Sequence, residues 1–322
     1  MPATLDIVRV GTFLKKADKT AVVGVQPNRL NEDPNLFGDL RNGLDLTCDG
    51  FRDEGYGDLF YSFFDYIKKT SNKGASLKKV INADFISNRR NLITIASSAF
   101  EGRAKKEIRA LRKNGVIFLC DRASENDTPH IDGTGYKFEQ YMTLNADGQP
   151  HHPNEPVSNA ECVRSVIRTT VRNGGEEIKV FYAAEVDAVD KNGSFGEIKT
   201  TMSDHEKWIR NKSMDHYLQA YLGMVSFIVK GRREGNIVRQ VSRIETSTIP
   251  AMEIRWDPQG CKDRLFQVLH KVRSELRNDN EALIISIDGK TVRYSREAVA
   301  SGWCPLLNDN ADRGASCPQD VT

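Results

Sequence analysis

One stretch of the sequence constrains the fold more than any other. Residues 181–201 read FYAAEVDAVDKNGSFGEIKTT, two runs of apolar and β-prone residues around a Lys-Asn-Gly turn. Such runs on either side of a turn of this type predict a β-hairpin. If the loop has three residues, with Gly193 in the left-handed position of a G1 bulge, Asp190 pairs with Ser194. A two-residue Asn-Gly loop is the alternative, and it gives a different register.

The register decides which charged side chains share a face. The three-residue loop sets Asp187 opposite Glu197 and Glu185 opposite Lys199, so that all four project from one side. The two-residue loop puts the two pairs on opposite faces. Three carboxylates and an ammonium on one face repel and desolvate one another unless a cation lies among them. The pattern therefore predicts a metal site, and the alternative is the solvated, charged face of an ordinary hairpin.

The ligand chemistry indicates which metal and which reaction to expect. Ligands that offer only oxygen favour Mg²⁺ or Mn²⁺ over zinc. Two such ions roughly 3.5 to 4 Å apart are a common device for in-line displacement at phosphorus. Lys199 would orient the attacking water or hold the phosphate. From the residues alone we expect a phosphodiesterase that uses two divalent ions.

Composition narrows the class of protein. The chain has 322 residues, 39% of them hydrophobic and 28% charged, and a formal net charge of +2. We expect one soluble catalytic domain over residues 1–322, with an irregular tail from about 305. No apolar stretch approaches a membrane span and no hydrophobic leader follows Met1, so we expect an intracellular protein of the nucleus or cytoplasm. The small net charge means that any attraction to phosphate is local.

Hydrophobic periodicity predicts an α/β (mixed) fold, with central twisted mixed β-sheets flanked by helices and the nuclease-like hairpin among them. Residues 27–54 are rich in Asn, Asp, Gly and Pro and predict an extended loop. In the helix predicted from Asp204, that residue is a plausible N-cap and Gly223 a plausible stop. The predicted strands span 4–25, 115–120, 161–172, 180–189, 225–230, 237–244 and, as a hairpin, 282–294. The predicted helices span 59–69, 135–142, 204–222 and 261–277.

Several motifs occur in a telling order: GYKFEQYM at 135–142, EVD at 185–187, EIK at 197–199, and then a helix that bears Gln219. In this order they resemble the decapping exoribonuclease (DXO) family of RNA 5′-end processing enzymes. The resemblance spans roughly residues 39–235 and is strongest from 135 to 219.

The resemblance implies a role for each matched residue. Arg89, Lys199 and Gln219 would hold the scissile phosphate. Family members often have an aromatic residue before this arginine and a glycine after it, where this chain has Asn88 and Arg90, so the choice between the two arginines stays open. The metal ligands would be Glu139 (directly or through a water), Glu185, Asp187, Glu197 and the backbone carbonyl of Ile198. Of the same residues, the catalytic set would be Glu185, Asp187, Glu197 and Lys199.

The resemblance also implies a function. Members of the family are similar in attacking RNA 5′ ends, releasing pyrophosphate from triphosphorylated ends, removing incomplete or NAD caps, and in some cases continuing as 5′-3′ exonucleases. We therefore expect a metal-dependent hydrolase of RNA 5′ ends that acts in RNA 5′-end quality control, with a 5′-3′ exoribonuclease as candidate partner. Two alternatives stay open: a DNA nuclease of the Glu-x-Lys type, and a catalytically silent protein that binds RNA ends. Clustered carboxylates without a metal are costly, which argues against the silent protein.

Overall fold

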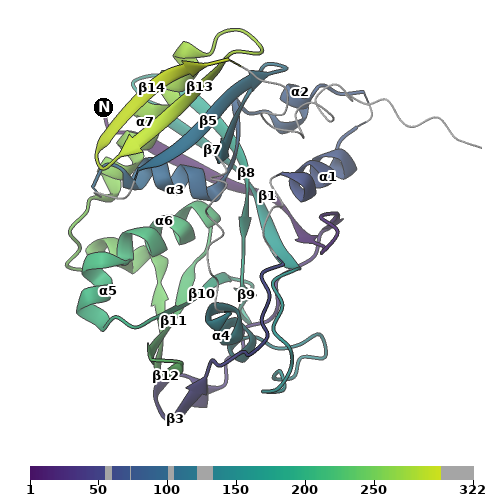
Figure 1. Cartoon of the computed structure of the whole chain (residues 1–322), viewed down its shortest axis with the longest axis vertical. Coiled ribbons are helices and arrows are strands. Elements are labelled where there is room, and N and C mark those ends of the chain that lie inside the picture. The colour runs from purple at the N-terminus through teal and green to yellow at the C-terminus, as the bar shows by residue number, and fades with distance from the viewer. Residues whose placement is uncertain (55–59, 73, 101–104, 122–132, 299–322) are drawn as a thin grey trace, which may run out of the picture.

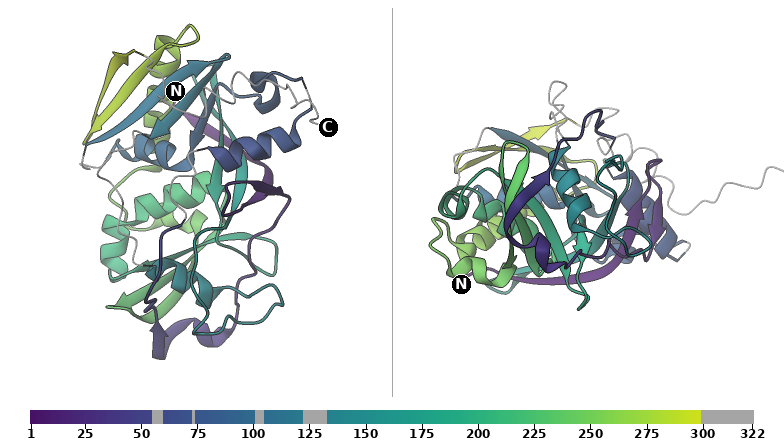
Figure 2. Two further views of the ribbon diagram at one scale, coloured as in Figure 1. Left: turned by 45° about the vertical axis from the view of Figure 1, so that its right-hand side comes forward. Right: turned by 90° about the horizontal axis from the view of Figure 1, so that it is seen from below.

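The computed structural model describes residues 1–54, 60–72, 74–100, 105–121 and 133–298. Within these ranges the chain forms two mixed β-sheets with helices packed against them, which confirms the predicted fold class. A sheet of nine strands lies in the upper half of Figure 1 and a sheet of five strands in the lower half. The left-hand view of Figure 2 keeps the same arrangement. The tail predicted from about 305 lies outside the described residues.

The nine-stranded sheet is antiparallel except at its centre, where β4 runs parallel to both β6 and β8. Its strand order is β14-β13-β5-β6-β4-β8-β7-β1-β2. The strands are β1 (Thr4–Lys15), β2 (Ala21–Val23), β4 (Phe85–Asn88), β5 (Lys106–Lys113), β6 (Val116–Asp121), β7 (Cys162–Asn173), β8 (Glu176–Glu185), β13 (Ala282–Asp288) and β14 (Thr291–Glu297). The central strand β4 leads directly into a helix whose first residue is Arg89.

Helices cover both faces of this sheet. On one face, apolar residues of α3, α6 and α7 form a single core with β4, β6, β7 and β8. On the other face, α1 and α2 pack on the sheet, and Phe63 of α1 stacks on Phe181. The helices are α1 (Tyr61–Thr70), α2 (Leu77–Ile81), α3 (Arg89–Ser97), α4 (Thr134–Met142), α5 (His205–Asn211), α6 (Ser213–Gly223) and α7 (Pro258–Glu275), with 3₁₀ turns η1 (Pro34–Leu36) and η2 (Thr246–Ala251). None of the helices in the described part of the chain is long and apolar enough to cross a membrane.

The five-stranded sheet has the order β3-β12-β11-β10-β9, and β10 runs parallel to β11. Helix α4 packs on one of its faces through Phe138, which lies against Gly231 so closely that a Cβ there would come within 2.7 Å of the ring. The strands are β3 (Gly38–Asp45), β9 (Ala188–Val189), β10 (Phe195–Thr201), β11 (Phe227–Glu234) and β12 (Ile237–Glu245). This sheet presents β10, which carries the EIK motif, to the region between the two sheets.

Most predicted elements are present, and three predictions about them are wrong. The extended loop predicted over 27–54 contains β3, an edge strand bonded only to β12 and largely exposed, so its sequence lacks the alternation that a buried face imposes. The helix predicted over 204–222 is two helices, interrupted at Lys212. Asp204 caps the first, as predicted, by accepting a hydrogen bond from the Lys207 amide. Gly223 does not stop the second, because the left-handed residue at its end is Met224 (φ 53°).

Candidate active site

The turn of the acidic hairpin has the predicted three-residue loop. Gly193 has φ 80°, its amide donates to the Asp190 carbonyl at 3.0 Å, and the Asp190 amide donates to the Ser194 carbonyl at 2.9 Å. The Asp190 carboxylate also accepts from the amides of Asn192 and Ser194. The register that follows from this loop is confirmed next to the turn, where Val189 pairs with Phe195.

Farther from the turn the predicted hairpin is wrong. Pairing of β9 with β10 ends at Ala188 and Gly196, and Glu185 pairs with Arg164 of β7 in the nine-stranded sheet rather than with Lys199. The chain therefore passes from one sheet to the other between β8 and β9. Strands β8 and β10 belong to different sheets, so they do not form one long ladder with each other.

Asp187 lies at this crossing and still faces β10. Its Oδ2 accepts a hydrogen bond from the Ile198 amide at 2.7 Å, and it lies 3.7 Å from Lys199 Nζ. The side chain of Ile198 points the other way, into the core of the five-stranded sheet. The two acidic strands are thus held together at the site by a side chain, where a hairpin ladder had been expected.

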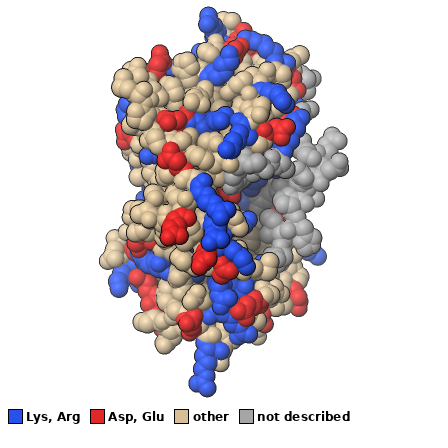
Figure 3. Space-filling view, turned by 90° about the vertical axis from the view of Figure 1, so that its left-hand side faces the viewer, with Lys and Arg blue, Asp and Glu red and all other residues tan. Residues whose placement is uncertain are grey.

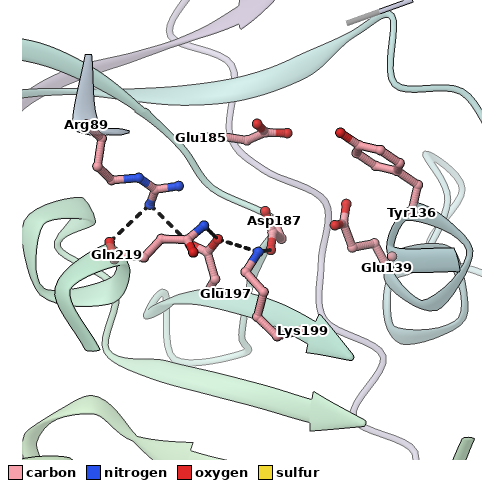
Figure 4. A pocket seen from close by; sticks show the side chains of 9 residues that line it. Arg89, Tyr136, Glu139, Glu185, Asp187, Glu197, Lys199 and Gln219 are labelled. Atoms are coloured by element: carbon pink, nitrogen blue, oxygen red, sulfur yellow. Dashed lines mark hydrogen bonds and ion pairs between the residues drawn. The ribbon is translucent and has the colours of Figure 1, made fainter. Parts of the chain in front are cut away.

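The structure brings the predicted side chains into one pocket of about 240 Å³ between the two sheets (Figure 4). Arg89 enters from the start of α3, and Glu139 enters from α4 on the opposite side. Arg90, the other candidate arginine, is exposed and does not line the pocket. The lining residues are Arg89, Gly135, Tyr136, Glu139, Glu185, Asp187, Glu197, Lys199 and Gln219.

The carboxylate of Glu197 contacts three neighbouring side chains of the pocket, and the Glu197 side chain is only 2% exposed. It accepts from Arg89 Nη1 at 3.1 Å, from Lys199 Nζ at 2.7 Å and from the side-chain amide of Gln219. Burial alone raises the pKa of a carboxyl group, but the two cations more than offset it, so the pKa of Glu197 lies below its usual value. Glu197 is therefore ionised at neutral pH.

The other buried carboxylates behave in the opposite way. Burial and then the charge of Glu197 raise the pKa of Asp187 to about 7. Burial and then Asp187 raise the pKa of Glu139 well above its usual value. The same carboxylates raise the pKa of Lys199 despite its burial, so the ammonium stays charged. The pocket therefore holds more carboxylates than its own cations neutralise.

This donor set fits a divalent cation. Four carboxylates offer only oxygen, and a bound cation would reverse the unfavourable ionisation of Asp187 and Glu139. Among the described residues, no group of three or more His, Cys, Asp or Glu side chains lies in a ready coordination shell. Oxygens of Glu197 and Asp187 also lie near protein donors, so a bound cation would share these carboxylates with Lys199.

Tyr136 lines the pocket and was not singled out from the sequence. Its hydroxyl points toward Glu185, and its ring stacks on Phe51 with centroids 5.6 Å apart (Figure 4). Burial and then the charge of Glu185 raise the pKa of Tyr136 to about 12, so the hydroxyl stays protonated. Its position within the GYKFE motif, three residues before Glu139, was the available signal.

Most of the chain matches a known protein family. Residues 9–315 match the family model described as RAI1-like PD-(D/E)XK nuclease. The chain is similar to the decapping nuclease dom-3 of Caenorhabditis elegans, 30% identical over 272 residues that cover 78% of this chain and 68% of that protein.

Solved structures share the fold. Rai1 of Scheffersomyces stipitis, in complex with 3′-NADP⁺ and a calcium ion, superposes with a TM-score of 0.75 and 18% identity over 98% of this chain and 97% of that one. Rai1 of Candida albicans, in complex with pU5 and Mn²⁺, superposes with a TM-score of 0.70 and 16% identity over 96% and 93% of the two chains.

Proposed function

This chain belongs to the RAI1-like PD-(D/E)XK nuclease family, and on that premise we propose that it is a divalent-metal-dependent hydrolase of RNA 5′ ends. The reaction class is hydrolysis of a phosphate ester or anhydride near the 5′ terminus, in which water adds to phosphorus and the P–O bond to the leaving group breaks. The names of its relatives, decapping nucleases among them, support this substrate class.

The proposal assigns metal binding to one set of pocket residues and phosphate binding to another. Glu139, Glu185, Asp187 and Glu197, with the carbonyl of Ile198, would hold Mg²⁺ or Mn²⁺. When bound, such ions supply Lewis acidity at the reacting phosphate. The relatives crystallised with calcium or manganese support a divalent ion.

Three donors that lie beside these carboxylates would hold the scissile phosphate: Arg89, Lys199 and Gln219. Arg89 and Lys199 carry fixed positive charge, and Gln219 adds a neutral amide donor. Charge-assisted donors that face a phosphate stabilise the negative charge that develops in the transition state. The planar fork of Arg89 suits two phosphate oxygens especially well.

One observation carries the proposal: Glu197 already contacts all three of these donors. The carboxylate that would bind metal and the groups that would bind phosphate therefore meet at a single point, which is the geometry that phosphoryl transfer needs. Over the face in Figure 3, by contrast, Lys and Arg form a band interrupted by Asp and Glu.

The test is product analysis by mass on RNAs that bear a 5′ triphosphate, an unmethylated cap, NAD or a monophosphate, with Mg²⁺ or Mn²⁺. The wild type is compared with Glu185→Gln/Asp187→Asn and with Glu206→Gln, an exposed acid on α5, as control. Metal-dependent release that the double variant loses and the control keeps is the expected result. Faster cleavage of matched DNA would favour the Glu-x-Lys DNA nuclease, and binding without any product would favour the silent protein.

Three further expectations belong to the same proposal. The chain acts as one catalytic domain, in the nucleus or cytoplasm, and a 5′-3′ exoribonuclease is its candidate partner. Co-purification of tagged protein with such an enzyme, and imaging of the tagged chain, test the last two. Limited proteolysis that yields one stable core tests the first.

A further inference from the structure

Arg89 is held at the C-terminal end of α6. Its Nη1 donates to the Gln219 backbone carbonyl at 3.1 Å as well as to Glu197, and its side chain is 10% exposed. The C-terminal end of a helix carries partial negative charge, which favours a cation there. The arginine therefore has a fixed place between α6 and β10, with its guanidinium lining the pocket.

Gly223 leaves room for this guanidinium. A Cβ built at Gly223 would lie 2.7 Å from Arg89 Nη1 and 3.9 Å from its Cζ, and the first distance is shorter than van der Waals contact allows. No backbone reason requires glycine at this position, because the positive φ that favours glycine falls on Met224 instead. Glycine is disfavoured within a helix, so its presence here needs a packing explanation.

The end of α6 cannot easily move away from Arg89. The Tyr182 hydroxyl donates to the Leu222 carbonyl at 2.8 Å, and Arg9 Nη2 donates to the Met224 carbonyl at 2.7 Å. Tyr182 is fully buried. These bonds tie the last turn of α6 to the nine-stranded sheet, so a methyl group added at Gly223 would displace the arginine rather than the helix.

We propose that Gly223 is a positioning residue for substrate binding: its missing side chain provides the space in which Arg89 must lie to reach a 5′ phosphate in the pocket. The inference rests on the proposed function, since it assigns Arg89 to the phosphate. The contact that it concerns, between Gly223 and Arg89, lies within the protein itself.

A double-mutant cycle tests it, with Arg89→Ala, Gly223→Ala and the two combined. The first readout is the dissociation constant of a 5′-phosphorylated, phosphorothioate-linked RNA pentamer in Mg²⁺, measured by fluorescence anisotropy. We expect each single change to weaken binding by about tenfold or more, the size of a lost charge-assisted bond. The double variant should bind no more weakly than Arg89→Ala alone.

Thermal unfolding of the same variants is the second readout. If the added methyl group destabilises the protein, Gly223→Ala should lower the unfolding temperature of the wild type but cause no further decrease in the Arg89→Ala background, because the methyl then occupies the vacated space. Gly260→Ala is the matched control: this helical glycine of α7 is equally crowded, 2.6 Å from Phe100, but does not line the pocket. It should leave RNA affinity unchanged.

The outcomes separate the two claims. Wild-type affinity in Arg89→Ala would overturn the phosphate role of Arg89 and with it this part of the proposed function. Weak binding by Arg89→Ala together with wild-type affinity in Gly223→Ala would overturn the positioning role alone. Additive effects of the two changes on both affinity and unfolding temperature would overturn it as well.

Discussion

Two aspartates of the same hairpin, three residues apart, have pKa values that are shifted in opposite directions. The side chains of Asp187 and Asp190 are 4% and 1% exposed, so both pay the cost of burial. The pKa of Asp187 is nevertheless raised to about 7, whereas that of Asp190 lies below its usual value. Burial raises both, but Asp190 is then stabilised by two amides of its own turn and by Arg243 at 3.0 Å.

The difference shows how a structural carboxylate differs from a functional one. Asp190 finds complete partners within the protein, while Asp187 faces Glu197 and shares Lys199 with it. A buried acid whose ionisation the protein itself does not satisfy is available to an external cation. The exposed fractions of the two side chains would not have separated them, although Asp187 lies deeper in the protein.

The largest expected effect is on catalysis. Asp187→Asn should lower the rate of RNA 5′-end hydrolysis by about 10³-fold or more, because a lost metal ligand removes several kcal/mol of transition-state stabilisation. Asp190→Ala, measured in the same steady-state assay below its unfolding temperature, should keep a rate close to the wild type. Equal losses of rate in the two variants would contradict the distinction between Asp187 as a functional carboxylate and Asp190 as a structural one.

The next effect is on the free energy of unfolding, and here Asp190→Ala should have the larger effect of the two variants. Asp190→Ala leaves two turn amides and Arg243 without their acceptor and should lower the free energy of unfolding by about 2 to 3 kcal/mol. Asp187→Asn should leave the free energy at pH 7 equal or higher, since it removes a crowded charge. Urea unfolding with a chelator present measures both.

The pH dependence of stability should also differ in sign. The folded protein holds the Asp187 proton up to about pH 7, whereas the unfolded chain releases it near 3.8, so this residue lowers the unfolding free energy as pH rises between those values. Asp190 has a lowered pKa, so its stabilising contribution is present above its unfolded pKa and is lost as pH falls through its folded pKa. Urea unfolding from pH 3 to 8 should show the first slope disappear in Asp187→Asn and the second in Asp190→Ala.

Metal affinity should follow the same titration. Because an ion binds the carboxylate form, binding below about pH 7 releases the Asp187 proton, and the association constant should rise up to about tenfold per pH unit there. Calorimetric titration of Mn²⁺ in buffers of different ionisation enthalpy measures the released protons directly. A pH-independent affinity between pH 5 and 7 would show that Asp187 is already ionised in the free protein.

The smallest effect concerns the turn itself. Gly193 has φ 80°, so Gly193→Ala should cost about 1 kcal/mol of stability, and Gly193→Asn less. Thermal unfolding measures the difference. Any loss of activity beyond the loss of folded protein would mean that the turn also sets the position of Asp187.

The local parts of this site were readable in the sequence, and the long-range parts were not. The Lys-Asn-Gly loop predicted the pairing of Asp190 with Ser194, because turn geometry depends on neighbouring residues. The passage of the chain between sheets at Asp187 was not predicted, since both strands have the same β-prone composition. It arises because β4 and β7 pair with the two edges of β8, which leaves β8 no free edge for β10.

Residues supplied by distant elements needed a different signal. Arg89 follows a short central strand, and only its family motif set it apart from Arg90. The exposed edge strand β3 was missed because neither of its faces imposes a hydrophobic pattern. Gly223 was assigned to helix termination, a role that depends on backbone angles the sequence does not display.

The crossing of the chain between sheets also has a consequence for the order of folding. Asp187 and the Ile198 amide are 11 residues apart, so the acidic half of the pocket closes by a local contact. Arg89 and Glu197 are 108 residues apart, and their contact must wait for the nine-stranded sheet to form. Since loop closure over long separations is slow, the local part of the site, which holds Asp187, Glu197 and Lys199, can form before Arg89 arrives. A newly folding chain would then present its carboxylates to solvent cations before it could hold an RNA end.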